Sequence, residues 1–270
     1  MDISQIVGNS FEYAKKLFSD LGRLAILIVL DLIPIVGWFI VWGYMTRVVK
    51  ETPSSLEPPP LRDYGDMFIQ GLKVAIAGFL YMLVPWILIA LGIGAFFFGA
   101  FGMGMLFPAF GALGIGLFVI GLILAIGIAI IMAMAIVHMV KNNSFGKAFA
   151  IGEILGIIGK IGWGKYILWL IVMVVIVAIA LAIGSIPWIG WLILLILGPA
   201  LYVFFGRSAA LIYSEAVPPV GVPPAPPAPP AYVPAPPPPP VGAPTVKFCV
   251  HCGAQIAAEA VFCPKCGGRQ

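Results

Sequence analysis

Residues 74–140 decide the fold, and they read VAIAGFLYMLVPWILIALGIGAFFFGAFGMGM followed by LFPAFGALGIGLFVIGLILAIGIAIIMAMAIVHMV. This stretch contains no Asp, Glu, Lys or Arg, and a second stretch without them covers residues 166–206. A bilayer core about 30 Å thick is crossed by roughly 20 helical residues. Each uncharged stretch is therefore long enough for two membrane crossings and the turn between them.

Composition places the whole chain in the same class. Hydrophobic residues make up 61% of the 270 and charged residues 10%, whereas an ordinary soluble domain has about 25% charged residues. Backbone exposed to lipid must satisfy its own hydrogen bonds, which leaves α-helices or closed barrels, and the uncharged stretches lack the alternation of barrel strands. We expect an all-α integral membrane protein in the lipid bilayer, with about four to five transmembrane helices plus interfacial or re-entrant helices.

The hydrophobic pattern places four full spans. Residues 98–108, rich in Gly and Phe, are expected to hold the turn of the first pair, and residues 184–187 the turn of the second. The connection 141–165 regains charge and carries many Gly residues, so it predicts a broken, partly helical segment at the interface. The expected spans are residues 71–97, 111–139, 166–183 and 188–206.

Residues 24–45 form an apolar segment whose middle suits a simple crossing poorly. Asp31 lies there, and an ionised carboxylate at the bilayer centre costs at least about 2.5 kcal/mol. Pro34 removes a backbone donor and disturbs the preceding turn. A bent or re-entrant hairpin relieves both problems and is the favoured interpretation, with a true span as the alternative.

One internal repeat supports the hairpin. Residues 33–40, IPIVGWFI, match residues 186–193, IPWIGWLI, at five identical positions. The second copy separates two hydrophobic helices, so the motif predicts a tight apolar turn at Pro34 as well. The alternative is a chance similarity within a biased composition.

The amino-terminal residues predict a short helix that begins at an N-cap of Asn9 or Ser10. Such a helix suits the membrane interface, and the alternative is a solvated helix that packs on nothing. No small-x-small cleavage site follows the first apolar stretch, so we expect no cleavable signal peptide. One face of the helix is apolar and consists of Phe11, Ala14, Phe18 and Leu21.

Basic residues lie beside the hydrophobic segments and predict the orientation. The connections 46–70 and 141–165 hold Lys and Arg, and Arg207 follows the last span, whereas the turns near residues 100 and 185 hold none. The positive-inside rule then places both connections and the carboxyl-terminal tail in the cytoplasm. We expect a multi-pass protein of the cell membrane with a cytoplasmic tail.

The tail from Ala216 to Pro244 consists almost entirely of Pro, Ala, Val and Gly. This composition forms extended polyproline II and no packed core. It predicts a disordered, Pro-rich linker that acts as a stiff spacer. The alternative is a ligand for the aromatic grooves of other domains.

All four cysteines of the chain follow this linker, as Cys249-x2-Cys252, ten residues, and Cys263-x2-Cys266. Two thiolates separated by two residues can both bind one tetrahedral ion at about 2.3 Å. The spacing therefore predicts a Zn2+ site formed by all four cysteines. A closed four-thiolate site leaves no coordination position for water, so the predicted role of the metal is structural.

The surroundings of these cysteines agree with a metal module. Gly253 and Gly267 permit a sharp backbone turn after each pair, and so short a segment needs metal binding to fold. Two disulfides are the alternative, which would require an oxidising compartment. His251 is expected not to bind the metal. The predicted domains are a helical transmembrane domain (1–215), a Pro-rich linker (216–246) and a zinc ribbon (247–270).

Four stretches, residues 11–16, 33–47, 63–73 and 206–215, carry a family resemblance. Through them, residues from about 9 to 215 resemble an uncharacterised prokaryotic membrane family, domain of unknown function 4013, which is common in methanogenic archaea. That family has no established activity, so the resemblance implies an architecture and no chemistry. The tail resembles the zinc ribbons appended to such proteins through Phe248-Cys249, Cys252-Gly253, Ile256, Phe262-Cys263-Pro264 and Cys266-Gly267.

The segments together favour a noncatalytic multi-pass membrane protein that presents a structural zinc ribbon on a cytoplasmic Pro-rich tether. Its expected role is protein–protein interaction or assembly, with a cytoplasmic protein partner or through self-association of the ribbon. No nucleic acid is expected, because the ribbon has too few charges. These are Lys247, Lys265 and Arg269 against Glu259.

The alternative function is a transporter or channel for a lipid-like or small solute, with the ribbon as a regulatory tail. Asp31 is the one ionisable residue inside an apolar segment and the first candidate for such a path. An enzyme is not expected, because the spans contain no paired carboxylates, no Ser/His/Asp arrangement and no open metal site. No catalytic residue and no organic cofactor is predicted.

Overall fold

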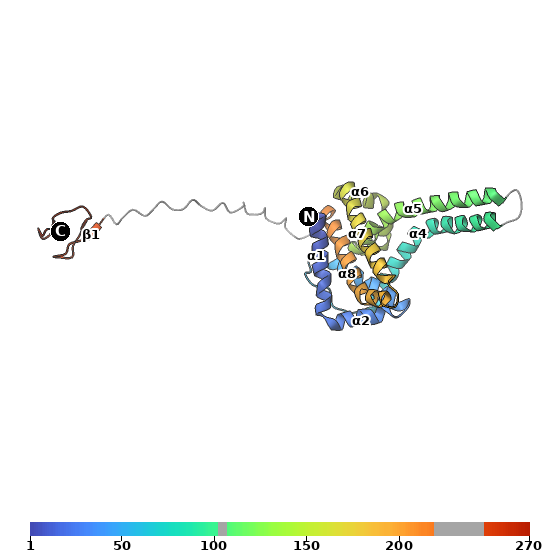
Figure 1. Ribbon diagram of the computed structural model, residues 1–270, viewed down its shortest axis with the longest axis horizontal. Coiled ribbons are helices and arrows are strands. Elements are labelled where there is room, and N and C mark those ends of the chain that lie inside the picture. The colour runs from blue at the N-terminus through green and yellow to red at the C-terminus, as the bar shows by residue number, and fades with distance from the viewer. Residues whose placement is uncertain (102–106, 219–245) are drawn as a thin grey trace. The chain divides into compact units, whose positions relative to one another are not determined.

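The structure, a computed structural model, describes residues 1–101, 107–218 and 246–270. The chain divides into two compact units, Met1–Val220 and Gly221–Gln270. The first is called here the membrane unit, and the described residues 246–270 of the second are called the ribbon. The predicted Pro-rich linker (216–246) lies almost entirely outside the described residues. The helices of the membrane unit are α1 (Ile3–Lys15), the 3-10 helix η1 (Lys16–Ser19), α2 (Leu21–Asp31), α3 (Val36–Glu51), α4 (Tyr64–Phe101), α5 (Phe107–Lys141), the 3-10 helix η2 (Phe145–Phe149), α6 (Ile151–Ile161), α7 (Trp163–Gly184) and α8 (Gly190–Ala216) (Figure 1).

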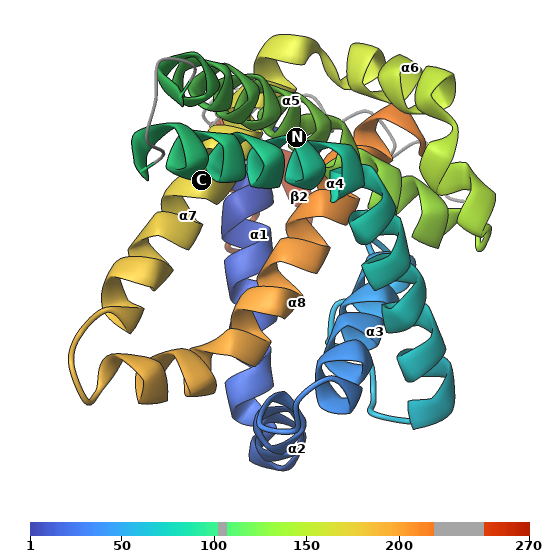
Figure 2. The same cartoon turned by 90° about the vertical axis from the view of Figure 1, so that its right-hand side faces the viewer.

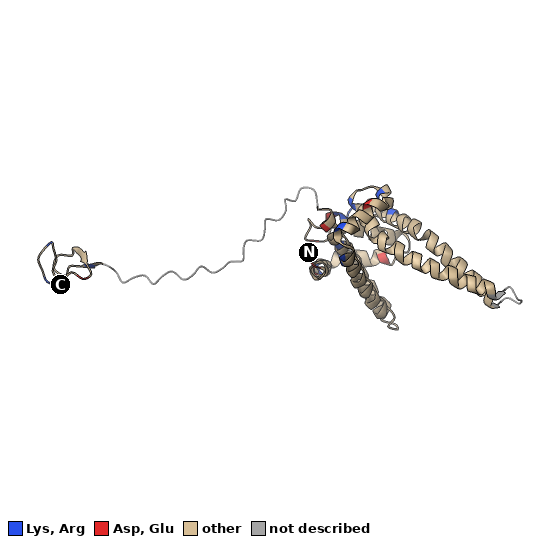
Figure 3. Cartoon of the chain, turned by 90° about the horizontal axis from the view of Figure 1, so that it is seen from above, with Lys and Arg blue, Asp and Glu red and all other residues tan. Residues whose placement is uncertain are grey.

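Among the described residues, four helices are long and apolar enough to cross a bilayer. These are α4, α5, α7 and α8, over Tyr64–Ala100, Ala109–Lys141, Trp163–Gly184 and Gly190–Ala216. The predicted class, an all-α multi-pass membrane protein, is confirmed. Charged residues gather at the end of the membrane unit from which the two helix pairs leave, and the tips of both pairs are uncharged (Figure 3).

All four spans are longer than predicted. The prediction ended the second pair at its first charged residues, whereas α7 begins at Trp163 and α8 continues to Ala216. Both helices extend because their charges are partnered inside the protein. The Lys165 ammonium lies 2.6 Å from the Glu215 carboxylate, and the Arg207 side chain is only 2% exposed.

Helices α4 and α5 pack at very short range through glycine. A Cβ added to Gly114 would lie 2.3 Å from the backbone nitrogen of Phe96, and one added to Gly92 would lie 2.6 Å from that of Phe118. Gly-rich helices that approach this closely are typical of membrane proteins. The predicted turn at 98–108 includes residues 102–106, which lie outside the described residues.

The first apolar segment is bent, as predicted. Helix α2 ends at Asp31, α3 begins at Val36, and the two helices pack against each other. Helix α3 also crosses α4 closely, because a Cβ on Gly43 would lie 1.8 Å from the carbonyl oxygen of Met67. The bend excludes a single continuous helical span over residues 24–45, which was the alternative.

The two copies of the internal repeat adopt the same turn. Ile35 and Trp188 occupy equivalent positions and have φ angles of 66° and 67°. In each copy, the N–H after this residue donates to the carbonyl of the preceding Pro at 2.8 Å, which makes a γ-turn centred on a left-handed residue. The predicted tight apolar turn is confirmed in both places.

A glycine makes each turn possible. A Cβ on Gly37 would lie 1.8 Å from the carbonyl oxygen of Leu30, and one on Gly190 would lie 2.4 Å from that of Ile183. Both glycines stand where the second helix of a pair starts against the end of the first. The repeated sequence therefore forms the same backbone turn at both places.

Helix α1 corrects the prediction for the amino terminus. It begins at Ile3 with Asp2 as N-cap, and Gln5 completes a capping box, so a cap at Asn9 or Ser10 is wrong. The two residues lie inside the helix instead, where the Ser10 hydroxyl donates to Ile6 O at 2.7 Å. Helix α1 lies along α8, which also excludes a helix that packs on nothing (Figure 2).

The connection 141–165 is broken and partly helical, as predicted. It consists of η2 and α6, and Gly162 separates α6 from α7 with φ of 93°. Helix α6 is amphipathic because its isoleucines at helical spacing face the protein. The buried residues of this face are Ile154, Ile157, Ile158 and Ile161.

Candidate functional site

The ribbon is built from two short strands and two turns. Strand β1 (Val246–Phe248) pairs antiparallel with β2 (Gln255–Ala257), with Phe248 opposite Gln255. An isolated bridge joins Phe262 to Arg269 at the corresponding place of the second half. In each half of the ribbon, the first cysteine therefore directly follows a Phe whose backbone is paired with another segment.

The two cysteine turns have the same hydrogen bonds. Gly253 N donates to Cys249 O at 2.9 Å, and Gly267 N donates to Cys263 O at 2.8 Å. These glycines have φ of 70° and 73°, the left-handed conformation that favours glycine. The glycine turns proposed from the sequence are thus present after both cysteine pairs.

The turns bring all four thiols together. One ligand atom from each of Cys249, Cys252, Cys263 and Cys266 lies within 4.8 Å of the others. The Sγ atoms of Cys249 and Cys266 are 3.6 Å apart, and those of Cys252 and Cys263 are 3.7 Å apart. A tetrahedral zinc with about 2.3 Å bonds needs sulfur–sulfur separations of about 3.8 Å, whereas a disulfide needs about 2.05 Å. The donor set therefore fits a zinc ion.

Nearby donors orient the first cysteine. Gln270 Nε2 donates to Cys249 Sγ at 3.0 Å, and the backbone N–H of His251 donates to it at 3.4 Å. Desolvation opposes the thiolate, but the backbone N–H groups of His251 and Cys252 prevail and lower the pKa of the Cys249 thiol to about 6. Such donors around a metal ligand hold it in place.

Two further residues complete the site. The His251 ring lies against Gly268, where an added Cβ would come within 2.6 Å of its Cδ2, and His251 is outside the metal-binding group. Gln270 was missed by sequence reasoning, since its amide reaches Cys249 from the other end of the module. No local motif marks such a contact.

A second cluster lies in the membrane unit, around the loop of residues 52–63. Side-chain donors from four helical segments bind successive carbonyl groups of this Pro-rich loop. A proline-rich loop has few N–H groups of its own, so these donors decide its path. The bonds, between 2.5 and 2.9 Å long, run from Tyr13 to Glu57, Lys16 to Leu56, Arg23 to Pro58, Tyr44 to Pro59 and Arg47 to Arg62.

Arg207 is the centre of this cluster. Its guanidinium donates to Ser55 O at 2.7 Å, Asn9 Oδ1 at 3.1 Å and Thr52 Oγ1 at 3.3 Å. It also lies 4.3 Å from the centroid of the Tyr13 ring, a cation–π contact. In the sequence Arg207 indicated only the orientation, whereas in the structure it also joins α1, α8 and the loop.

His138 belongs to a third polar group, which ties α5 to α6 and α8. Its Nδ1 lies 2.8 Å from Tyr213 Oη and its Nε2 lies 2.9 Å from Glu153 Oε2. Hydrogen bonds from Lys147 and then from His138 lower the pKa of the Glu153 carboxyl group. These hydrogen bonds, together with the ion pair between Lys147 and Glu153 at 2.6 Å, give each polar side chain of the group a partner.

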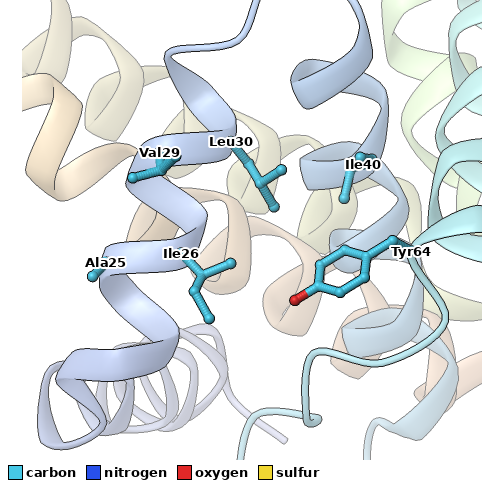
Figure 4. A pocket seen from close by; sticks show the side chains of 6 residues that line it. All are labelled: Ala25, Ile26, Val29, Leu30, Ile40 and Tyr64. Carbon is cyan, nitrogen blue, oxygen red and sulfur yellow. The ribbon is translucent and has the colours of Figure 1, made fainter.

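Two open cavities lie beside α2. One, of about 480 Å3, is lined by α2, by Ile40 and by Tyr64, whose hydroxyl points into the space between α2 and α3 (Figure 4). The other, of about 370 Å3, lies between α2, α7 and α8 and contains Asp31. The one acidic residue predicted inside an apolar segment thus faces a cavity.

Two family models match parts of this chain. The family described as protein of unknown function (DUF4013) matches residues 26–189, more than half of the chain. The chain belongs to this family. A zinc-ribbon domain matches residues 248–269. No curated protein and no solved structure matches the chain.

Both resemblances stated from the sequence are confirmed. The DUF4013 match includes α3 to α7 and the end of α2, with narrower bounds than the expected 9–215. Arg207 and α1 lie outside the matched range, although they complete the loop cluster. Membership in DUF4013 describes a membrane architecture, and the ribbon adds a metal-binding module.

Proposed function

We propose that this protein is a noncatalytic membrane anchor whose structural zinc ribbon binds a protein partner in the cytoplasm. The membrane unit supplies the anchor through its four long apolar helices. The ribbon supplies a closed site for one metal ion. The ion stabilises the module, and its four cysteine ligands leave no coordination position for a substrate. The predicted Pro-rich linker (216–246) connects the membrane anchor to the ribbon.

The exposed apolar surface of the ribbon carries this proposal. A metal-bound module of this size has little core, so its large side chains face outward. Patches of exposed apolar residues on a soluble module are typical of protein interaction sites. The side chains concerned, 42% to 79% exposed, are Val246, Phe248, Val250, Val261 and Phe262.

Crosslinking in native membranes tests the partner. Full-length protein is compared with the double variant Phe248→Ser/Phe262→Ser and with Glu259→Gln as a matched surface control. We expect the double variant to keep its zinc and lose the crosslinked partner, while the control keeps both. A partner recovered equally from all three proteins would contradict the proposal, and crosslinks to a second copy of this chain would assign the ribbon to self-association.

Thiol labelling tests the side of the membrane. The four cysteines of the chain all lie in the ribbon, so a membrane-impermeant maleimide reports on this module alone. We infer a cytoplasmic location from the basic residues at the charged end of the membrane unit. Labelling is expected only after permeabilisation and metal chelation. Labelling of chelator-treated intact cells would place the ribbon outside.

A further inference from the structure

The cavity between α2, α7 and α8 combines one acidic group with aromatic walls. It has a volume of about 370 Å3 and is lined mainly by aliphatic side chains of α7 and α8. Asp31 enters it from the end of α2, and Trp191, Tyr202 and Phe205 enter it from α8. This volume lies within the range of about 300–1,000 Å3 that is common for small-molecule sites.

A glycine on α8 makes room for the acidic group. A Cβ added to Gly198 would lie 3.2 Å from Asp31 Oδ2, so the carboxylate lies directly against the helix backbone. Gly198 stands eight residues after Gly190, which corresponds to about 12 Å along α8. The carboxylate therefore lies well inside the apolar length of the helix pair and away from the charged end of the unit.

The polar groups of the cavity have no protein partners in the described part of the chain. Within residues 1–101, 107–218 and 246–270, no hydrogen bond or ion pair reaches the Asp31 carboxylate, the Tyr202 hydroxyl or the Trp191 indole N–H. The equivalent tryptophan of the first repeat differs, since Trp38 Nε1 donates to Asp31 O at 3.0 Å. Asp31 and Tyr202 are half-buried and Trp191 is 61% exposed, so their polar groups are accessible to a molecule in the cavity. A few convergent polar groups in an otherwise apolar pocket are typical of a ligand site.

We propose that this cavity binds an organic cation that carries apolar substituents. The Asp31 carboxylate supplies the opposite charge, and the rings of Trp191, Tyr202 and Phe205 supply faces that attract ammonium-type cations. A hard metal ion fits less well, because Ca2+ takes six to eight oxygen ligands and the cavity offers one carboxylate. The proposal is independent of the ribbon and of its partner.

Equilibrium dialysis with radiolabelled tetraphenylphosphonium tests the site in the full-length protein in phosphatidylglycerol nanodiscs. We expect saturable binding at one site per chain, weakened at least about tenfold by Asp31→Asn, which removes the charge and keeps the shape. Asp31→Glu keeps the charge and is expected to retain most of the binding. Glu12→Gln, a change of charge at an exposed position of α1, is the matched control and is expected to bind like the unchanged protein.

Neutral triphenylphosphine oxide distinguishes charge recognition from partition into an apolar space. The proposal is overturned if this compound competes as well as tetraphenylphosphonium, if Asp31→Asn binds normally, or if the unchanged protein shows no saturable binding. Each variant is first shown to be monodisperse with an unchanged helical circular dichroism spectrum. Displacement of the probe by phosphatidylethanolamine would identify a lipid amine as the source of the cation, and lack of displacement a free cation.

Discussion

The ribbon and the membrane unit each contain a glycine turn used twice, but the copies depend on each other differently. In the ribbon, the turns at 249–254 and 263–268 contribute thiols to one metal site. In the membrane unit, the turns at 33–40 and 186–193 each close a separate helix pair. Loss of one ribbon turn therefore removes both, whereas loss of one membrane turn leaves the other intact.

The membrane unit has its own central cation in Arg207. The four thiols of the ribbon come from two turns, and the oxygen atoms that accept hydrogen bonds from this guanidinium likewise come from separate segments, at Asn9, Thr52 and Ser55. The difference lies in what else holds the parts together. Among the described residues, the buried core of the ribbon consists of Cys249, Ile256 and Cys263, with Ala254 and Ala260 packed against it, while the membrane unit has an extensive apolar core. The following experiments test this contrast.

The largest effect is expected for the ribbon. Cys263→Ser removes one ligand, and because structural zinc contributes about 10 kcal/mol or more to such modules, both turns should unfold. Bound zinc should fall from one per chain to none, and the tail should become sensitive to protease up to its last residue. The helical circular dichroism signal should not change.

Lys265→Ala lies between two ligands and is the control for this change, with zinc content expected to stay at one. Retention of zinc by Cys263→Ser would contradict the interdependence of the two turns. Removal of zinc by a chelator should reproduce the effect of the variant without any substitution.

Alanine at the turn glycines should destabilise the membrane unit by about 3 kcal/mol, since the added carbon overlaps a backbone oxygen that cannot move freely. Gly37→Ala is expected to cost more than Gly190→Ala, because its contact is 1.8 Å instead of 2.4 Å. Unfolding by denaturant in mixed micelles measures both. Gly8→Ala, with open space around the added carbon, is the control.

The double variant Gly37→Ala/Gly190→Ala shows whether the membrane turns are independent. Separate turns predict that the two free-energy changes add, within about 0.5 kcal/mol. Strong non-additivity would mean that these turns, like those of the ribbon, form one cooperative element.

Arg207→Met keeps most of the side-chain volume and removes the guanidinium. A loss of about 2 kcal/mol is expected, because the buried Thr52 hydroxyl and the half-buried Ser55 carbonyl lose a charged donor. The loop should also become accessible to protease in the folded protein. Arg62→Met, at an exposed position of the same loop, is expected to have no effect on either measurement. If both variants lost the same stability and became equally accessible to protease, the prediction that Arg207 holds the loop in place would be wrong.

The smallest effect is a gain of about 1 kcal/mol for Ile35→Gly and for Trp188→Gly, since both residues hold a strained positive φ that glycine adopts freely. Their side chains are 62% and 91% exposed, so little packing is lost. The thermal midpoint in detergent should rise for each variant. A fall at both positions would show that the side chains matter more than the backbone conformation.

Much of this architecture could be predicted from the sequence, because lipid and metal impose local patterns. Absence of charge located the four spans, a repeated IPxxGW motif located two turns, and cysteine spacing located the group of four thiols that fits a zinc ion. Helix ends were less well predicted, because Lys165 and Glu215 neutralise each other across 50 positions of the chain. Charge alone marks a helix end only when the charge stays in water.

The loop cluster could not be predicted either, because its partners are also far apart in the sequence. Tyr13 and Tyr44 donate to Glu57 O and Pro59 O from distant helices, and no local pattern indicates such pairs. Burial raises the pKa of Tyr13 to about 12, so its hydroxyl is a donor at neutral pH. The N-cap was misplaced because Asp2 and Gln5 form a capping box before the polar pair at Asn9 and Ser10.

The length of α4 has a consequence for the bilayer. From Val74 onward, its uncharged part measures about 42 Å, whereas the uncharged part of α7, from Tyr166, measures about 29 Å and the hydrocarbon layer about 30 Å. A hydrophobic helix longer than the hydrocarbon layer is accommodated by tilting, so α4 and α5 are expected to tilt more from the membrane normal than α7. The two pairs do point in different directions (Figures 1 and 3). A thicker membrane would reduce this tilt and bring the pairs closer to parallel.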